Sequence, residues 1–179
     1  MNDNSLPGLI HLYCGEGKGK TTAALGLIVR ASGAGYDVVI VQYFKSWDTS
    51  ELLTLQGFPN VTVIHGELPH AFTWELSDMA RHEIVEVHNR MFRKAVDSVK
   101  PDIPTLLVMD EIIGATSYAY IDSNMVLDYL RNKPDNVEVV MTGRNPLPEF
   151  VELADYVSDI CKIKHPYDRG IFARKGIEY

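Results

Sequence analysis

The sequence predicts an α/β protein in which a mostly parallel sheet is covered by helices on both faces. Short β-branched runs alternate along the chain with stretches of helical periodicity. The runs are almost continuously apolar, which is typical of strands buried on both faces rather than of a half-solvated sheet. A chain of 179 residues can bury one sizeable core, so we expect residues 1–179 to form a single domain.

Six strands are expected from the apolar runs, at 9–13, 38–44, 61–65, 106–110, 137–142 and 157–163. Helical spacing predicts a first helix over 21–32, with Gly33 as a plausible C-cap, and a long one over 77–99 that stops before Pro101. Shorter helices are expected at 123–131 and 148–154. Segments 46–57 and 66–76 show no period, and we expect both near the carboxyl ends of strands, where open α/β sheets bind ligands.

Composition narrows the class of protein. The formal net charge is −7 and the pI about 5.3, which argues against a nucleic-acid partner. No apolar run approaches the roughly 20 residues that span a bilayer, so no membrane partner is expected. The two cysteines lack CxxC spacing and suit a reducing compartment, which predicts a cytoplasmic protein. The histidines form no metal-binding pattern, because His82 and His88 are six residues apart.

The first expected strand runs into CGEGKGKTT, residues 14–22, at the start of a helix. This strand, glycine-rich turn and helix are the context of a Walker A loop, whose backbone amides cradle phosphates. Lys20 would neutralise phosphate oxygens, and Thr21 or Thr22 would offer a hydroxyl to Mg²⁺. The spacing is one residue short, because Cys14 stands where the motif has its first glycine. The alternative is a plain glycine turn with solvated lysines. The expected ATP-binding residues are Gly15, Glu16, Gly17, Lys18, Gly19, Lys20, Thr21, Thr22 and Arg144.

The run LLVMDE, residues 106–111, is an apolar strand that ends in two carboxylates. We interpret it as a Walker B segment in which Asp110 holds Mg²⁺ directly or through water. Glu111 would order either the metal shell or a water, and the sequence does not separate these roles. Acidic residues at strand ends are also common on protein surfaces. Arg144 follows a later strand and either contacts a phosphate or closes an ion pair, and Lys45 follows the second strand at a similar height.

Three further motifs accompany these two: HAFTWE at 70–75, TGRNPLPEFVELAD at 142–155 and KHPYDRGIFARKGIEY at 164–179. Together the five resemble the ATP:corrinoid adenosyltransferases of the cob(I)yrinic acid a,c-diamide type over almost the whole chain. The resemblance implies a RecA-like P-loop NTPase fold and a homodimer. It also implies transfer of the 5′-deoxyadenosyl group of ATP to the cobalt of a reduced corrinoid, with release of triphosphate. In that family the loop surrounds the terminal phosphate, and the shortened loop also occurs there.

The resemblance assigns roles to residues. Lys20, Asp110 and Glu111 would be catalytic, and Thr21, Asp110 and Glu111 would hold Mg²⁺, with Mn²⁺ as an alternative. Phe72 and Trp74 would form the dry corrinoid-binding surface that removes the axial cobalt ligand; their alternative role is to anchor a loop in the core. Because cobalt(I) is itself the nucleophile, the protein needs no attacking side chain.

The resemblance also leaves open the acceptor, which is cob(I)alamin, cobinamide or cob(I)yrinic acid a,c-diamide, and implies an electron-donating reductase. Only about eight residues precede the first strand, so we expect no long N-terminal lid, and segments 46–57 and 66–76 would close over the corrinoid. Arg169, Arg174 and Lys175 are either a solvated tail or part of an ordered segment near the nucleotide or a subunit contact. The competing functions are a P-loop ATPase or phosphotransferase and a non-catalytic, nucleotide-gated corrinoid carrier.

Overall fold

The computed structural model describes residues 7–45, 49–66 and 77–178. Its centre is a six-stranded sheet in the order β3-β2-β4-β5-β1-β6, and every neighbouring pair of these strands is parallel. The strands are β1 (Ile10–Cys14), β2 (Asp37–Gln42), β3 (Val61–His65), β4 (Thr105–Asp110), β5 (Val137–Thr142) and β6 (Tyr156–Asp159).

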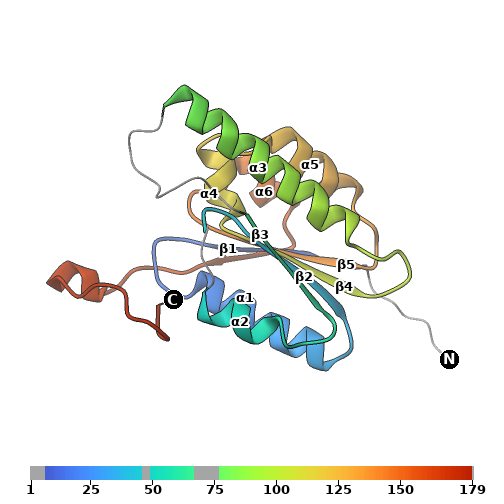
Figure 1. The fold of residues 1–179 in the computed structure, drawn as a ribbon, viewed down its shortest axis with the longest axis horizontal. Coiled ribbons are helices and arrows are strands. Elements are labelled where there is room, and N and C mark those ends of the chain that lie inside the picture. Colours follow the sequence, from blue (N-terminus) through green and yellow to red (C-terminus); the bar gives the residue numbers. More distant parts are fainter. Residues whose placement is uncertain (1–6, 46–48, 67–76, 179) are drawn as a thin grey trace.

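Helices cover both faces of this sheet (Figure 1). On one face lie α1 (Lys20–Gly33) and α2 (Ser50–Leu55), and on the other lie α3 (Asp78–Asp97), α4 (Ile112–Ser117), α5 (Ser123–Asn132) and α6 (Pro148–Leu153). A short 3₁₀ turn, η1 (Pro166–Arg169), belongs to a C-terminal arm that extends away from the sheet. No helix in the described part of the chain is long and apolar enough to cross a membrane.

Alternating side chains of the central strands fill the two cores. On β2, Val39 and Val41 pack in the core on the α3 side, whereas Val38 and Ile40 pack against α1. The same alternation places the last residues of three neighbouring strands on the α1 face: Gln42 of β2, Asp110 of β4 and Thr142 of β5. All three are fully buried. The carboxyl ends of the strands thus form a short polar row beneath the start of α1.

The structure agrees with the expected strands at 61–65 and 137–142, and shifts β1, β2 and β4 by one or two residues. β6 ends earlier than expected, because the chain beyond Asp159 leaves the strand to contact the glycine-rich loop: Gly17 N donates to Ile160 O at 2.6 Å. The expectation that 46–57 is irregular was wrong, since α2 lies within it. Helix α4 was not predicted. Gly33 is the last residue of α1 rather than its cap, which is Ala34.

Candidate functional site

The loop between β1 and α1, residues 15–19, packs closely against the segment that follows β6. Gly15 and Gly19 have φ values of 101° and 124°, a backbone region that favours glycine. A Cβ at Gly15 would lie 2.1 Å from Asp159 Oδ1 and 2.7 Å from Ile160 O. Glycine is therefore required at Gly15 both by conformation and by space, and the loop has a fixed shape before any ligand arrives.

Lys20, the first residue of α1, holds this loop from inside. Its ammonium group donates to the carbonyl oxygens of Gly15 at 2.7 Å and Gly17 at 2.9 Å. Burial lowers the pKa of Lys20, and the carboxylate of Glu111 opposes that shift. A phosphate oxygen would bind the ammonium more strongly than a neutral carbonyl does. Lys20 is therefore placed to exchange loop carbonyls for an anion.

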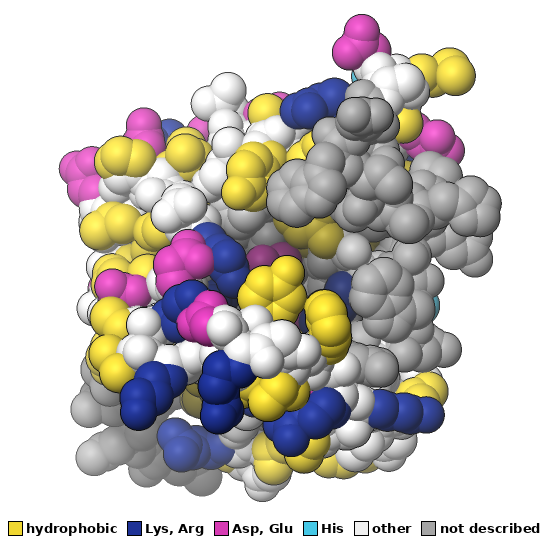
Figure 2. Space-filling model, turned by 90° about the vertical axis from the view of Figure 1, so that its left-hand side faces the viewer, with side chains coloured by type: hydrophobic (Ala, Val, Ile, Leu, Met, Phe, Trp, Pro, Cys, Tyr) yellow, Lys and Arg dark blue, Asp and Glu magenta, His cyan; other side chains and the backbone are white. Residues whose placement is uncertain are grey.

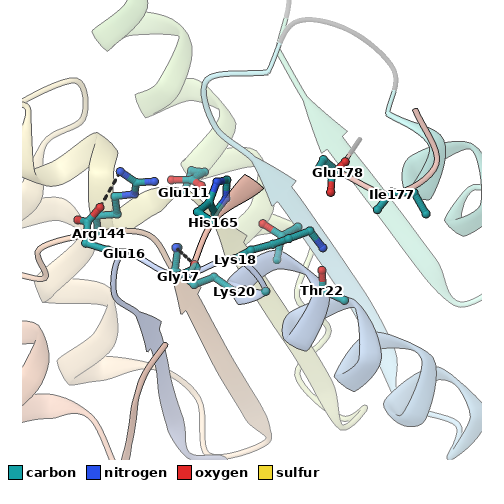
Figure 3. A pocket seen from close by; sticks show the side chains of 12 residues that line it. Glu16, Gly17, Lys18, Lys20, Thr22, Glu111, Arg144, His165, Ile177 and Glu178 are labelled. Carbon is teal, nitrogen blue, oxygen red and sulfur yellow. Dashed lines mark hydrogen bonds and ion pairs between the residues drawn. The ribbon is translucent and has the colours of Figure 1, made fainter. Parts of the chain in front are cut away.

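A cavity of about 320 Å³ opens above the loop, and Figure 3 shows the side chains around it. Lys18 and Lys20 line it from the loop, and Glu111 and Arg144 from the ends of β4 and β5. Arg144 Nη1 is paired with Glu16 Oε2 at 2.8 Å, so both roles considered for Arg144 remain compatible with its position. The remaining described walls come from residues 17, 19, 21 and 22 and from His165, Ile177 and Glu178.

Asp110 is the centre of the polar row and is saturated with donors. Its Oδ1 accepts hydrogen bonds from the hydroxyls of Thr21 at 2.8 Å and Thr142 at 2.7 Å. Its Oδ2 accepts from Gln42 Nε2 at 3.1 Å and from Lys45 Nζ at 3.2 Å. The structure therefore brings together two of the predicted metal-binding residues, Thr21 and Asp110. It also adds three partners that the sequence analysis did not assign to them.

Glu111 lies one residue further, at the start of α4, in a left-handed backbone conformation with φ 65°. Its backbone N–H donates to Thr142 Oγ1 at 2.9 Å. Burial, and after it the charge of Asp110, raise the pKa of Glu111, while Lys20 and Lys45 lower it. Two neighbouring carboxylates, one of them disfavoured in its charged form, are an environment that a bound cation would stabilise.

Several site residues were not found from the sequence. Gln42 and Thr142 were missed, although both end apolar runs that pair with the strand of Asp110.

The C-terminal arm also reaches the cavity, through Ile177 and Glu178. Arg174 is paired with Glu178 at 3.1 Å. The arm thus lies near the candidate nucleotide site, while Arg169, Arg174 and Lys175 do not line the cavity and are exposed. Phe72 and Trp74 lie outside the described residues. Within the described ranges, no group of three or more His, Cys, Asp and Glu side chains forms a metal site.

Strand order, the glycine-rich loop and the acidic strand end define a nucleotide-binding protein of the P-loop class, with β5 inserted between the loop strand β1 and the acidic strand β4. Solved structures agree with this fold. ATPases 2 and 3 of EssC from Geobacillus thermodenitrificans align with a TM-score of 0.54 at 15% identity, over 94% of this chain and 35% of that one. The cytoplasmic domain of EssC aligns with a TM-score of 0.53 at 14% identity, over 94% and 34%. The predicted fold class is confirmed.

Sequence relatives identify the family. The sequence model of the ATP:corrinoid adenosyltransferases BtuR/CobO/CobP matches residues 7–179. A corrinoid adenosyltransferase of Sinorhizobium sp is 37% identical, over 96% of this chain and 80% of the relative. Corrinoid adenosyltransferase CobA of Salmonella typhimurium is 34% identical, over 96% and 86%. The chain belongs to the ATP:corrinoid adenosyltransferase family, as the resemblance of its motifs indicated.

Proposed function

We propose that this protein transfers the 5′-deoxyadenosyl group of ATP to the cobalt(I) of a corrinoid and releases triphosphate. Membership of the family over residues 7–179 supports the reaction. The observation that carries it within this chain is the cavity over Lys20, which has phosphate-binding groups on one side and Glu111 on the other, with Asp110 bonded to the lining residue Thr21. Two lysines beside the loop amides suit the polyphosphate of a nucleotide.

In this reaction the corrinoid would supply the nucleophile, and the protein would supply orientation and electrostatic stabilisation. The cobalt(I) electron pair forms the Co–C5′ bond as the C5′–O bond breaks, and both electrons of that broken bond leave with triphosphate. Lys18, Lys20 and the loop amides would stabilise the charge on the departing triphosphate, because they are fixed where that charge develops. Arg144 would add a third cation once it leaves Glu16. The protein thereby lowers the barrier by orientation and electrostatics.

The residues at this site fit a Mg²⁺ ion, or Mn²⁺ in its place. Thr21, Asp110 and Glu111 offer hard oxygen atoms, which these ions prefer together with substrate phosphates. Gln42 Oε1 is buried and has no hydrogen-bond partner among the described residues, so it is available to a water of the metal shell. When bound, the ion would supply positive charge against the polyphosphate.

Exposed side chains on the surface bear on the proposed protein partners. Figure 2 shows a band of Lys and Arg side chains across the lower part of the face in view, with hydrophobic side chains between them. On the C-terminal arm, Ile163, Tyr167 and Phe172 are 86%, 65% and 73% exposed. An apolar arm of this kind favours a protein contact, and we propose a homodimer. We further propose a cytoplasmic enzyme of one domain, supplied with electrons by a reductase, with Phe72 and Trp74 facing the corrinoid.

Product identification tests the proposal. The purified protein is incubated anaerobically in the dark with Mg-ATP, reductant and cob(I)alamin, cobinamide or cob(I)yrinic acid a,c-diamide. We expect a light-sensitive Co–C product and one triphosphate for each corrinoid consumed. Release of ADP and phosphate without alkylated cobalt would instead indicate an ATPase or phosphotransferase. Binding of both substrates without any product would indicate a carrier.

A further inference from the structure

His88 is a fully buried histidine in the middle of α3 and does not line the cavity described above. Its ring meets the rings of Tyr43 and Phe44 edge to face, each with centroids 5.1 Å apart. Its Nε2 lies 3.5 Å from the backbone N of Phe44, and its Nδ1 lies 3.0 Å from the carbonyl oxygen of Tyr120. One side chain of α3 therefore joins the segment after β2 to the loop between α4 and α5.

The two partners fix the protonation of the ring. A backbone N–H can only donate, so Nε2 of His88 must accept from Phe44. A carbonyl oxygen can only accept, so Nδ1 must carry the proton and donate to Tyr120. The neutral ring with its proton on Nδ1 is the form that satisfies both contacts. Burial favours the same neutral form, since it lowers the pKa of His88.

Phe44 is the residue at which the chain turns back toward the site. The backbone of Tyr43 still donates to Asp110 O at 3.0 Å, extending the pairing of β2 with β4. Phe44 then adopts a left-handed conformation with φ 61°, which is unfavourable for a residue with a side chain. After this turn, Lys45 Nζ lies 3.2 Å from Asp110 Oδ2 and 3.8 Å from Glu51 Oε1. The position of the Lys45 ammonium thus depends on a strained turn.

We infer that His88 is a positioning residue of the nucleotide site, which holds the left-handed turn at Phe44 and so directs Lys45 to Asp110 and the polyphosphate. The inference rests on the proposed function for the role of Lys45 and Asp110. His88 accepts the backbone N–H of Phe44 and packs against the Phe44 ring, so it stabilises the strained conformation from the buried side. The competing explanation is that His88 only fills the core beneath β2.

Substitutions that replace one ring nitrogen at a time separate the two explanations. Glutamine can place an amide oxygen near the position of Nε2 and keep an acceptor for Phe44. Asparagine reaches only the position of Nδ1 and leaves the Phe44 N–H without an acceptor. Both lose ring packing, so a core-filling role predicts similar effects for H88N and H88Q. His82→Asn, on the exposed side of the same helix, is the matched control.

The measurement is the affinity for Mg-ATP by isothermal titration calorimetry without corrinoid, on variants shown to be folded by circular dichroism. We expect H88N to weaken binding about tenfold, H88Q by less than about threefold and H82N hardly at all. If H88N does not fold, H88L replaces it, because leucine fills similar volume without an acceptor. Equal weakening by the acceptor-free variant and by H88Q would overturn the inference.

A double-mutant cycle with Lys45→Met tests whether His88 acts through Lys45. We expect K45M to weaken Mg-ATP binding, and the acceptor-free His88 variant to add less than about twofold in that background. The inference is overturned if K45M has no effect, or if the His88 variant weakens binding equally in both backgrounds. Binding is measured without cobalt chemistry, so a wild-type protein that binds Mg-ATP but forms no Co–C bond would refute the proposed function alone.

Discussion

Asp110→Asn is the sharpest test of the polar row, because it removes one charge and keeps the shape of the side chain. The carboxylate accepts from Thr21 and Thr142 on one oxygen and from Gln42 and Lys45 on the other. An amide has one acceptor oxygen, and its NH₂ group must turn toward the two threonine hydroxyls, which can also accept. Lys45 then loses its nearer counter-ion and keeps only Glu51, at 3.8 Å.

Breaking a buried ion pair from one side costs about 3–5 kcal/mol of folding free energy. Lys45 keeps partial exposure and can rotate toward water, so we expect the lower end, about 3 kcal/mol. Urea unfolding followed by circular dichroism measures the loss. Asp102→Asn, at an exposed position before β4, is the control and should change stability by less than about 0.5 kcal/mol. If D110N were no less stable than D102N, the ion pair between Lys45 and Asp110 would not exist in solution.

Three further predictions concern neighbouring side chains. Lys20→Ala should abolish most ATP-dependent turnover while the protein stays folded, and unchanged turnover would refute the phosphate role of Lys20. Gln42→Met removes one hydrogen bond and one unpartnered acceptor together, so the stability of the ligand-free protein should change by less than about 1 kcal/mol. The Mg²⁺ concentration for half-maximal ATP binding should rise. An unchanged Mg²⁺ requirement would exclude Gln42 from the metal shell. His88 has its folded-state pKa lowered to about 4, below its ordinary value of 6.5, so the unfolded state binds more protons between these values. The contribution of neutral His88 to the free energy of unfolding is therefore fully present above about pH 6.5 and decreases by up to about 3 kcal/mol as the pH falls to 4. Unfolding free energies measured from pH 7 to 4 should show that slope in wild type and lose it in H88Q; a slope that persists in H88Q must come from other groups.

The central strands were predictable because their burial on both faces leaves an unbroken apolar signature. β5 matches to the residue, and β2 and β4 differ by at most two residues. The two edge strands are less buried: β3 still matches to the residue, whereas β6, all of whose residues are exposed, does not. Helix α2 has only six residues, too few to show a period, although Leu52 and Leu55 on one side of it are buried. Helix α4 continues the apolar run of β4 and contains Gly114, so composition gives no sign of a helix there.

The site was predictable where it follows from strand ends and not where it depends on one backbone angle. Thr21 and Asp110 meet because a helix start and a strand end face each other across a parallel sheet. Lys45 reaches Asp110 only because Phe44 is left-handed, and no local pattern predicts that conformation for phenylalanine. Ile177 and Glu178 approach the cavity through a long-range fold of the arm, which periodicity does not encode.

Three cations at or beside the cavity already have protein partners, and this couples the binding of nucleotide to the binding of metal. Without nucleotide, Lys20 binds loop carbonyls, Arg144 binds Glu16 and Lys45 binds Asp110. A polyphosphate that draws Lys45 away leaves Asp110 Oδ2 with only the hydrogen bond from Gln42 and opens a position for the metal shell, so ATP should raise the affinity for Mg²⁺, and Mg²⁺ must raise the affinity for ATP by the same factor. Calorimetric titration measures the coupling, with Mn²⁺ in place of Mg²⁺ because Mn²⁺ binds more strongly. Mn²⁺ should bind the free protein weakly and should bind at least about tenfold more tightly when an ATP analogue is present. The metal bound by the free analogue is subtracted. In K45M, Asp110 Oδ2 lacks the Lys45 contact from the start, so the coupling factor should shrink. A coupling factor equal to that of wild type would show that Lys45 does not compete with the metal for Asp110.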